Sequence, residues 1–349
     1  MAVVAGLVGV VATGVGVAVA VPRLLATGPS WVAVAGLVVL AGGLAFLATA
    51  VVGFWRATWR WWRLALAPLL VLGLVGGYAV ATGVLAAVPA PTPLAATTPT
   101  FPVPLAEVGV PTEDGVRLSA WWAPPRNGRV VVVLHGSGEN RSAALPQAAV
   151  VARAGYGVLL LDARGHGRSE GRGMGFGWYG DQDVAGALDF VAAQPGVRGD
   201  PVALLGLSMG GEEAVGAAVS DGRVRAVVAE GATHRTAVDK ARWLPTGTAG
   251  TLQRGIDRLT YGLADLVSPA SPPPPLQDAV ARAQGTSFLL VAAGSRPDET
   301  NAAEVLRRAA PDRVRVWTVP GAGHTGGLRA QPEQWEQTVL AFLDTALDR

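Results

Sequence analysis

Ser208 stands between two glycines where an apolar run gives way to a helix-like segment. The run Val202 to Leu207 is typical of a buried strand, and the alanine-rich stretch from Met209 to Val219 is typical of a helix. With Gly206 and Gly210 the serine forms a G-x-S-x-G pattern, which in a strand-turn-helix setting holds a nucleophile in a tight, exposed turn. The alternative is a tight turn with an incidental serine. Because a serine hydroxyl is a weak nucleophile on its own, the chemistry also requires a base and an orienting acid.

The base is expected among the histidines. Of the four histidines, His135 and His166 precede Ser208, whereas His234 and His324 follow it. The chain order serine, acid, histidine accompanies this kind of turn, and only His324 leaves room for an acid from a later strand end. His324 is therefore the expected base, and His234, which begins an irregular segment, is the less favoured alternative.

The acid is expected in the loop after Val291, where the sequence reads AAGSRPDE. Asp298 and Glu299 are both candidates. Glu299 suits the first turn of the next helix, where a carboxylate interacts favourably with the helix dipole. We therefore prefer Asp298 as the acid and retain Glu299 as the alternative.

Backbone N–H groups near Ser208 are expected to stabilise the oxyanion that forms in acyl transfer. One is the N–H of Met209, at the start of the predicted helix. The segment LHGSGENR, residues 134–141, follows another strand and supplies the second donor, the N–H of Ser137 or Gly138. The same glycines suit a simple turn before a helix, and the two roles are compatible.

Short apolar strands alternate with helical stretches from about Leu105 onward. A hairpin is predicted where residues 105–110 and 116–123 flank a Glu-Asp-Gly turn. Further strands are predicted at 130–134, 158–162, 202–207, 224–229, 288–292 and 314–319, with helices around 145–153, 179–193, 209–219, 300–310 and 333–347. This α/β alternation predicts a mainly parallel sheet with helices on both faces, whose sites gather at the carboxyl ends of the strands.

The segment before Glu107 has a different character. It contains no acidic residue, and three uncharged apolar runs occupy about 2–21, 31–55 and 64–88. Each run is about 20 residues or longer, which is enough for a helix to cross roughly 30 Å of hydrocarbon. We therefore predict a transmembrane region over 1–88 with three transmembrane helices. A hairpin buried in a soluble core is the alternative, which such long and purely apolar runs disfavour.

Loop charge predicts the orientation of these helices. The loop Arg56–Arg63 carries three arginines, against the single Arg23 in the other short loop, and positively charged loops stay in the cytoplasm. The third helix then ends outside, which predicts a multi-pass protein of the cell membrane with an extracytoplasmic catalytic domain. Cleavage of the first run would not change this prediction, because the last run still ends outside. The Pro- and Thr-rich stretch 89–104 is typical of a semi-extended linker.

Composition excludes several classes of function. Cysteine is absent, which removes a disulfide framework, a thiolate nucleophile and Cys-ligated zinc. With the four arginines before Glu107 set aside, 24 of the 28 basic residues remain against 26 acidic ones, so no basic surface for nucleic acid is expected. The stretch GAGHTG at 321–326 fits a dinucleotide fingerprint, but only a terminal helix follows it, and the sole lysine, Lys240, lies outside any P-loop pattern. We expect neither cofactor nor metal.

The motifs after Leu105 resemble those of the α/β-hydrolase superfamily. They are HGSG, DARGHGRSEG, GLSMGG and VPGAGHTGG, in this order. The resemblance is to the serine esterase, dienelactone-hydrolase-like and prolyl-peptidase-like branches. It implies an α/β-hydrolase domain over 105–349, acyl transfer to Ser208 followed by hydrolysis, His324 as base, Asp298 as acid, and no cofactor. Asp298 departs from the pattern, since the family commonly places its aspartate three residues after the glycine that ends the strand, and Asp298 lies four after Gly294.

An insert of about 55 residues, at 231–285, resembles the caps that cover active sites in this superfamily. Its apolar residues suit either an acyl-binding pocket or packing of the cap onto the sheet; they are Trp243, Leu244, Leu252, Ile256, Leu259, Tyr261 and Leu263. Three polar residues in the DARGHG loop, Asp162, Arg164 and His166, are expected to brace that loop rather than to do chemistry.

The sequence therefore predicts a membrane-anchored serine hydrolase that cleaves a carboxylic ester or related acyl bond through an acyl-enzyme. Its expected partners are a small-molecule or lipid-like acyl substrate and the lipid bilayer, and no nucleic acid. A serine peptidase of the prolyl-peptidase type is the alternative among enzymes. A non-catalytic binding module on a hydrolase fold is the alternative from another class, since a fold does not guarantee an activity.

Overall fold

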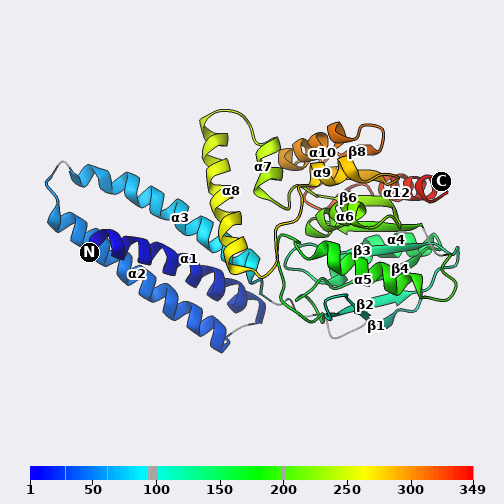
Figure 1. Cartoon of the computed structure of the whole chain (residues 1–349), viewed down its shortest axis with the longest axis horizontal. Coiled ribbons are helices and arrows are strands. Elements are labelled where there is room, and N and C mark those ends of the chain that lie inside the picture. Colours follow the sequence, from blue (N-terminus) through cyan, green and yellow to red (C-terminus); the bar gives the residue numbers. More distant parts are fainter. Residues whose placement is uncertain are drawn as a thin grey trace. The chain divides into compact units, whose positions relative to one another are not determined.

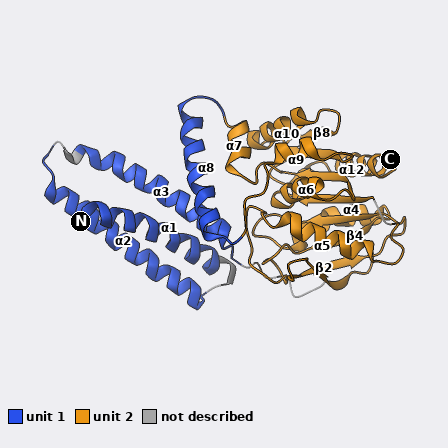
Figure 2. Cartoon of the chain, in the orientation of Figure 1, with its two compact units in different colours: residues 1–91, 245–269 blue, residues 92–244, 270–349 orange. Residues whose placement is uncertain are grey.

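The computed structural model describes residues 1–27, 29–60, 62–90, 92, 94, 101–198 and 201–348. Of the predicted linker at 89–104, residues 91, 93 and 95–100 lie outside the described residues. The chain forms two compact units (Figure 2): Met1–Pro91 with Pro245–Pro269, and Thr92–Leu244 with Ala270–Arg349.

Three helices of the first unit coincide with the three apolar runs (Figure 1). They are α1 (Ala2–Thr27), α2 (Trp31–Ala57) and α3 (Leu66–Ala87), with a short 3-10 helix η1 (Trp62–Ala65) before α3. By length and composition each is able to cross a membrane, with mean hydropathy of 2.4, 2.4 and 2.1 over its apolar window. Glycines let α1 and α2 approach closely: a Cβ on Gly16 would lie 2.5 Å from the backbone nitrogen of Leu40.

The predicted insert at 231–285 is divided between the two units. Its central helix α8 (Thr248–Val267) packs against α3 in the first unit, where a Cβ on Gly83 would lie 2.7 Å from the carbonyl oxygen of Thr260. The flanking helices α7 (Ala237–Trp243) and α9 (Leu276–Arg282) belong to the second unit. The sequence predicted the whole insert as part of the second domain. The contact between α8 and α3 was not predictable, because it joins segments far apart in the chain.

The second unit is built on a sheet with strand order β1-β2-β4-β3-β5-β6-β7-β8. β1 (Ala106–Pro111) and β2 (Arg117–Ala123) form the predicted antiparallel hairpin, and β2 also pairs antiparallel with β4. The other pairs are parallel. Their strands are β3 (Val130–Leu134), β4 (Gly157–Leu161), β5 (Val202–Leu207), β6 (Val224–Glu230), β7 (Ser287–Ala293) and β8 (Val314–Val319). The prediction of a mainly parallel sheet is confirmed.

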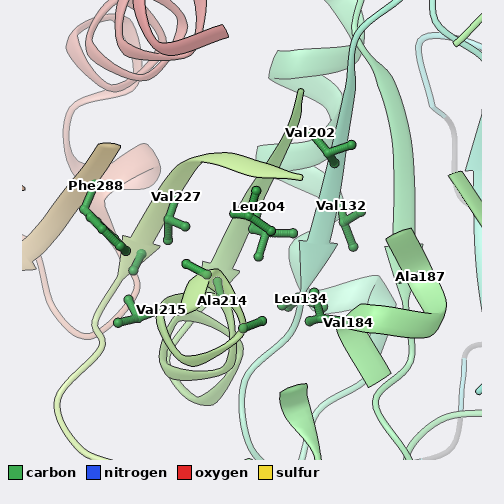
Figure 3. Packing of buried hydrophobic residues seen from close by; sticks show 14 of the residues in the cluster. Val132, Leu134, Val184, Ala187, Val202, Leu204, Ala214, Val215, Val227 and Phe288 are labelled. Atoms are coloured by element: carbon green, nitrogen blue, oxygen red, sulfur yellow. The ribbon is translucent and has the colours of Figure 1, made fainter. Parts of the chain in front are cut away.

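Helices cover both faces of this sheet, which explains why its central strands are apolar throughout. Successive residues of β3 alternate between two cores: Val132 and Leu134 belong to one, and Val131 and Val133 to the other. The first core, part of which Figure 3 shows, also contains residues of α5 (Gly180–Ala192), α6 (Met209–Ser220), α9 and α10 (Pro297–Ala309). The second contains residues of α4 (Leu145–Arg153) and α12 (Pro332–Leu347). Two short helices, η2 (Arg141–Ala144) and α11 (Gly327–Ala330), precede α4 and α12.

Candidate active site

Ser208 occupies a strained turn between β5 and α6. Its φ of 53° and ψ of −118° place a non-glycine residue in the left-handed half of φ, which persists only where the surrounding structure enforces it. The flanking glycines make the turn possible, since a Cβ on Gly206 would lie 2.1 Å from the Gly210 carbonyl oxygen and one on Gly210 would lie 2.5 Å from the Leu134 carbonyl oxygen. The turn therefore needs the G-x-S-x-G glycines for steric reasons.

His324 lies in the loop after β8 and contacts Ser208 directly. Its Nε2 atom lies 2.8 Å from Ser208 Oγ, and its Nδ1 atom lies 2.7 Å from Oε1 of Glu299. The structure thus brings the serine and the expected base together and adds a carboxylate on the far side of the imidazole ring. His234, the alternative base, has its Nδ1 atom 2.5 Å from Thr233 Oγ1 instead.

The carboxylate beside His324 is Glu299, which corrects the preference for Asp298. Glu299 is 1% exposed, and its second oxygen accepts the backbone N–H of Ala293 at 2.8 Å. Asp298 instead forms an ion pair with Arg296, at 2.8 Å. Both acids occupy the first turn of α10, so the helix dipole favours both and does not separate them. Adjacent helical residues point about 100° apart, and only Glu299 faces the end of the sheet.

The buried carboxylate has an electrostatic effect on the histidine. The hydrogen bond from Nδ1 to Glu299 raises the pKa of His324 above its ordinary value, against an opposing effect of partial burial. A raised pKa makes the imidazole a stronger base, and the fixed Nδ1–H leaves Nε2 free to accept the Ser208 proton.

The predicted oxyanion donors lie on segments adjacent to Ser208. Met209 is buried and is the first residue of α6, so its N–H lies at the positive end of the helix dipole. In the loop after β3, a Cβ on Gly136 would lie 3.5 Å from Cβ of Ser208, and Ser137 and Gly138 follow as exposed residues. This loop is the only other glycine-rich segment that the sequence analysis proposed for the role.

Side chains with no role predicted from the sequence hold the loop after β3 in place. The carboxylate of Glu139 accepts the Gly136 N–H at 3.2 Å, and the Glu139 N–H donates to the Gly136 carbonyl oxygen at 3.2 Å. From the linker, the hydroxyl of Thr92 donates to the Gly138 carbonyl oxygen. The contact between Glu139 and Gly136 was predictable, because the glutamate follows the glycine by three residues. The contact between Thr92 and Gly138 was not, because it joins segments far apart in the sequence.

Glu230 is a second residue that the sequence analysis missed. It ends β6 as a buried carboxylate that accepts the Gly327 N–H at 2.6 Å and the Trp335 Nε1–H at 3.0 Å. Its backbone oxygen accepts the Ser208 N–H at 2.8 Å. Glu230 therefore links the serine turn to the segment just after His324, and an acid that ends an apolar strand was the signal for it.

The DARGHG loop is braced by its own polar residues, as expected. Asp162 is buried and accepts the backbone N–H groups of Arg141 at 2.7 Å and Arg168 at 2.9 Å. Arg164 forms a buried ion pair with Asp183 at 2.9 Å. These contacts pair the buried polar groups of Asp162 and Arg164 with partners other than Ser208.

Buried histidine also has a structural role in this part of the unit. His135 Nε2 accepts the Ala163 N–H at 3.0 Å, and its ring centroid lies 5.3 Å from that of His166. Burial lowers the pKa of His135 to about 3, so it stays neutral. Among the described residues, no group of three or more His, Asp or Glu side chains has an arrangement that would hold a metal ion.

Sequence comparisons point to hydrolases. Residues 125–286 match a family model described as serine aminopeptidase, S33. Thiohydrolase aneE of Aspergillus aculeatus is 35% identical over 126 residues, 35% of this chain and 40% of that protein, so the chain spans about two fifths of that relative. The uncharacterized protein MT2364 of Mycobacterium tuberculosis is 29% identical over 225 residues, 62% of this chain and 72% of that protein.

Solved structures share the fold at lower sequence identity. The esterase Pf2001 of Pyrococcus furiosus superposes with a TM-score of 0.55 and 21% identity, over 73% of this chain and 99% of that one. The carboxylesterase CesB of Bacillus subtilis gives a TM-score of 0.50 and 19% identity, over 70% of this chain and 93% of that one. Taken with the strand order and the turn at Ser208, these similarities show that the second unit has the α/β-hydrolase fold.

Proposed function

We propose that the protein is a membrane-anchored serine hydrolase that cleaves carboxylic esters through an acyl-enzyme. The observation that carries the proposal is the chain of contacts from Ser208 Oγ to His324 Nε2, at 2.8 Å, and from His324 Nδ1 to Glu299, at 2.7 Å. A serine with an adjacent base and a third group that orients the base is the arrangement of nucleophilic catalysis.

The chemistry follows from these contacts. His324 Nε2 removes the proton from Ser208 as Oγ attacks the substrate carbonyl carbon, and the negative charge moves to the carbonyl oxygen. The N–H of Met209 and that of Ser137 or Gly138 donate to this oxyanion. His324 then gives its proton to the departing alcohol. Water, deprotonated by the same nitrogen, attacks the acyl-enzyme and releases the acid and the free serine.

Glu299 acts on this cycle through His324. Its carboxylate accepts the Nδ1–H, which selects the tautomer with a free Nε2 and stabilises the imidazolium that forms during attack. Because Glu299 is 1% exposed, water screens this interaction less than it would screen a pair at the surface.

The ester preference is supported by solved esterases that share the fold. A peptidase is the second candidate, and the family model described as serine aminopeptidase favours it. Matched p-nitrophenyl esters and p-nitroanilides of the same acyl groups separate the two: an esterase should hydrolyse the esters and leave the anilides intact. Because serine peptidases also cleave activated esters, sustained cleavage of the anilides is the result that would favour the peptidase.

The membrane part of the proposal rests on α1, α2 and α3. Their length and hydropathy support three membrane spans, and the arginines of the loop 56–63 support a cytoplasmic position for that loop. The end of α3, and the hydrolase domain after it, would then be extracytoplasmic. A lipid-like acyl ester is a fitting substrate for an enzyme tethered in this way.

Labelling of the serine tests the proposal directly. A fluorophosphonate probe should label the purified wild type and fail to label Ser208→Ala, with strongly reduced labelling of His324→Ala. Asp298→Asn, which removes the ion pair with Arg296 and leaves the contact chain intact, serves as the control that keeps labelling. A folded wild type that resists the probe would contradict the proposal and favour a non-catalytic binding module.

A further inference from the structure

The helix α8 has three distinct surfaces around its circumference. One is buried and comprises residues 250, 257, 260, 261 and 264. The second, here called the apolar stripe, consists of residues spaced three or four apart: Leu252, Ile256, Leu259, Leu263 and Leu266. The third is polar and carries Arg254, Arg258 and Asp265. An amphipathic helix of this kind needs an apolar environment for its stripe.

Much of the apolar stripe has no protein cover. Leu252, Leu259 and Leu266 are 61%, 47% and 81% exposed, although leucine is among the residues most often buried. Beside the stripe lies an open cavity of about 730 Å³, which Val75 of α3 lines together with Leu252, Ile256 and Leu259. None of the lining residues that the structure describes is charged.

The stripe is continuous with the apolar surface of the membrane-spanning candidates. Leu263 packs against a small cluster that Ala18 of α1 forms with Val80 and Val84 of α3. The contact between α8 and Gly83 lies four residues before the end of α3 at Ala87, which is about 6 Å along the helix axis. α8 therefore meets α3 at the depth where amphipathic helices lie in a bilayer, about 5–10 Å from the headgroup boundary.

We propose that α8 is an interfacial helix whose apolar stripe lies in the bilayer, with the acyl chain of a bilayer lipid in the cavity beside Val75. The proposal rests on the proposed membrane spans α1–α3, because the same hydrocarbon covers both. Arg254 and Arg258 on the polar surface lie on the side where lipid phosphates would meet them. A second copy of the chain is the other possible cover for the stripe, and the experiment distinguishes it.

The test uses the absence of cysteine from the chain, so that single cysteines can be introduced without other changes. Leu259→Cys and Leu266→Cys place an environment-sensitive fluorophore on the stripe. Their immediate neighbours, Arg258→Cys and Asp265→Cys, place it on the exposed polar surface of the same helix. Each labelled protein is reconstituted in phosphatidylcholine nanodiscs in which part of the lipid carries a nitroxide on its acyl chain.

Acyl-chain nitroxide should quench the two stripe positions several-fold more strongly than the two polar positions. Equal quenching at all four positions, or none at the stripe, would overturn the proposal. Energy transfer between copies labelled at Leu266→Cys, without quenching by lipid, would overturn it in favour of a dimer. Circular dichroism and monodisperse elution establish that each variant is folded.

A labelled position on α2 tests the proposed membrane spans separately from the proposed interfacial helix. Val38→Cys lies on α2, where the side chain is 67% exposed, and reports whether the candidate spans enter hydrocarbon. Quenching at Val38→Cys without quenching at the stripe overturns only the interfacial helix, whereas no quenching at either overturns the membrane proposal as well. Because the readout needs no turnover, it can be repeated on Ser208→Ala and is independent of the proposed catalysis.

Discussion

Replacing Glu299 with glutamine tests the role of the buried carboxylate with almost no change in side-chain size. In the wild type, one carboxylate oxygen accepts the Ala293 N–H at 2.8 Å and the other accepts the His324 Nδ1–H at 2.7 Å. Glutamine has only one oxygen. If that oxygen keeps the Ala293 contact, the amide NH₂ faces Nδ1 and favours the tautomer with the proton on Nε2. That proton then points at Ser208 and blocks its deprotonation.

The expected loss of activity in Glu299→Gln is large. A wrong histidine tautomer in a triad of this type lowers kcat by about 10⁴-fold, or about 5 kcal/mol at roughly 1.4 kcal/mol for each factor of ten. Asp298→Asn is the matched control, because it removes an exposed ion pair with Arg296. Such pairs contribute up to about 1 kcal/mol to stability. Because Asp298 pairs with Arg296 and Glu299 is the residue that contacts His324, the activity of Asp298→Asn should stay close to that of wild type.

Hydrolysis of a p-nitrophenyl ester as a function of pH provides the assay. Activity requires neutral His324, so in the wild type it should fall as pH drops through a pKa that Glu299 raises above 6.5. In Glu299→Gln the residual activity should persist to lower pH, because the cause of the raised pKa is gone. A loss in Asp298→Asn equal to that in Glu299→Gln, or an unshifted acid limb, would refute the reasoning.

Three further predictions concern the scaffold. Gly206→Ala should abolish labelling of Ser208 or prevent folding, because the new Cβ would lie 2.1 Å from the Gly210 carbonyl oxygen; Gly222→Ala, where no atom lies within 4 Å, should keep labelling by the fluorophosphonate probe. Burial raises the pKa of Glu213 from 4.5 to about 8, so the folded state holds a proton that the unfolded state releases, and wild-type stability should fall as pH rises through that range. Glu213→Gln should reduce this fall in Tm, and an identical pH dependence in thermal melts would contradict it. Glu230→Gln should weaken the contacts to Gly327 and Trp335. The resulting displacement of His324 should lower kcat by about tenfold or more, whereas an unchanged kcat with a lowered Tm would show that these contacts are only structural.

The fold was predictable because its signals are local. The buried strands β3 and β5 lie at the residues where apolar runs predicted them, since strands covered on both faces are continuously apolar and their ends are easy to recognise. The turn at Ser208 was equally readable, because its glycines are a steric requirement of the turn itself. His324 followed from chain order, which the α/β arrangement imposes.

The acid was not predictable in the same way. Asp298 and Glu299 are adjacent carboxylates in one helical turn. They differ in direction, because only one of them faces the end of the sheet. That direction is set when α10 packs on β7 and places Glu299 against Ala293. The position of α8 could not be predicted either, because its amphipathic pattern does not say whether the helix packs on the sheet or on α3.

The sequence by itself determined the three apolar helices, the mainly parallel sheet, the serine turn and the histidine that follows the last strand, because each is specified by residues close together in the chain. Only the tertiary structure decided that Glu299 contacts His324, that Glu230 links the serine turn to the segment after His324, and that α8 packs on α3. These are contacts between segments distant in sequence, and their partners are selected by the packing of whole elements rather than by local pattern.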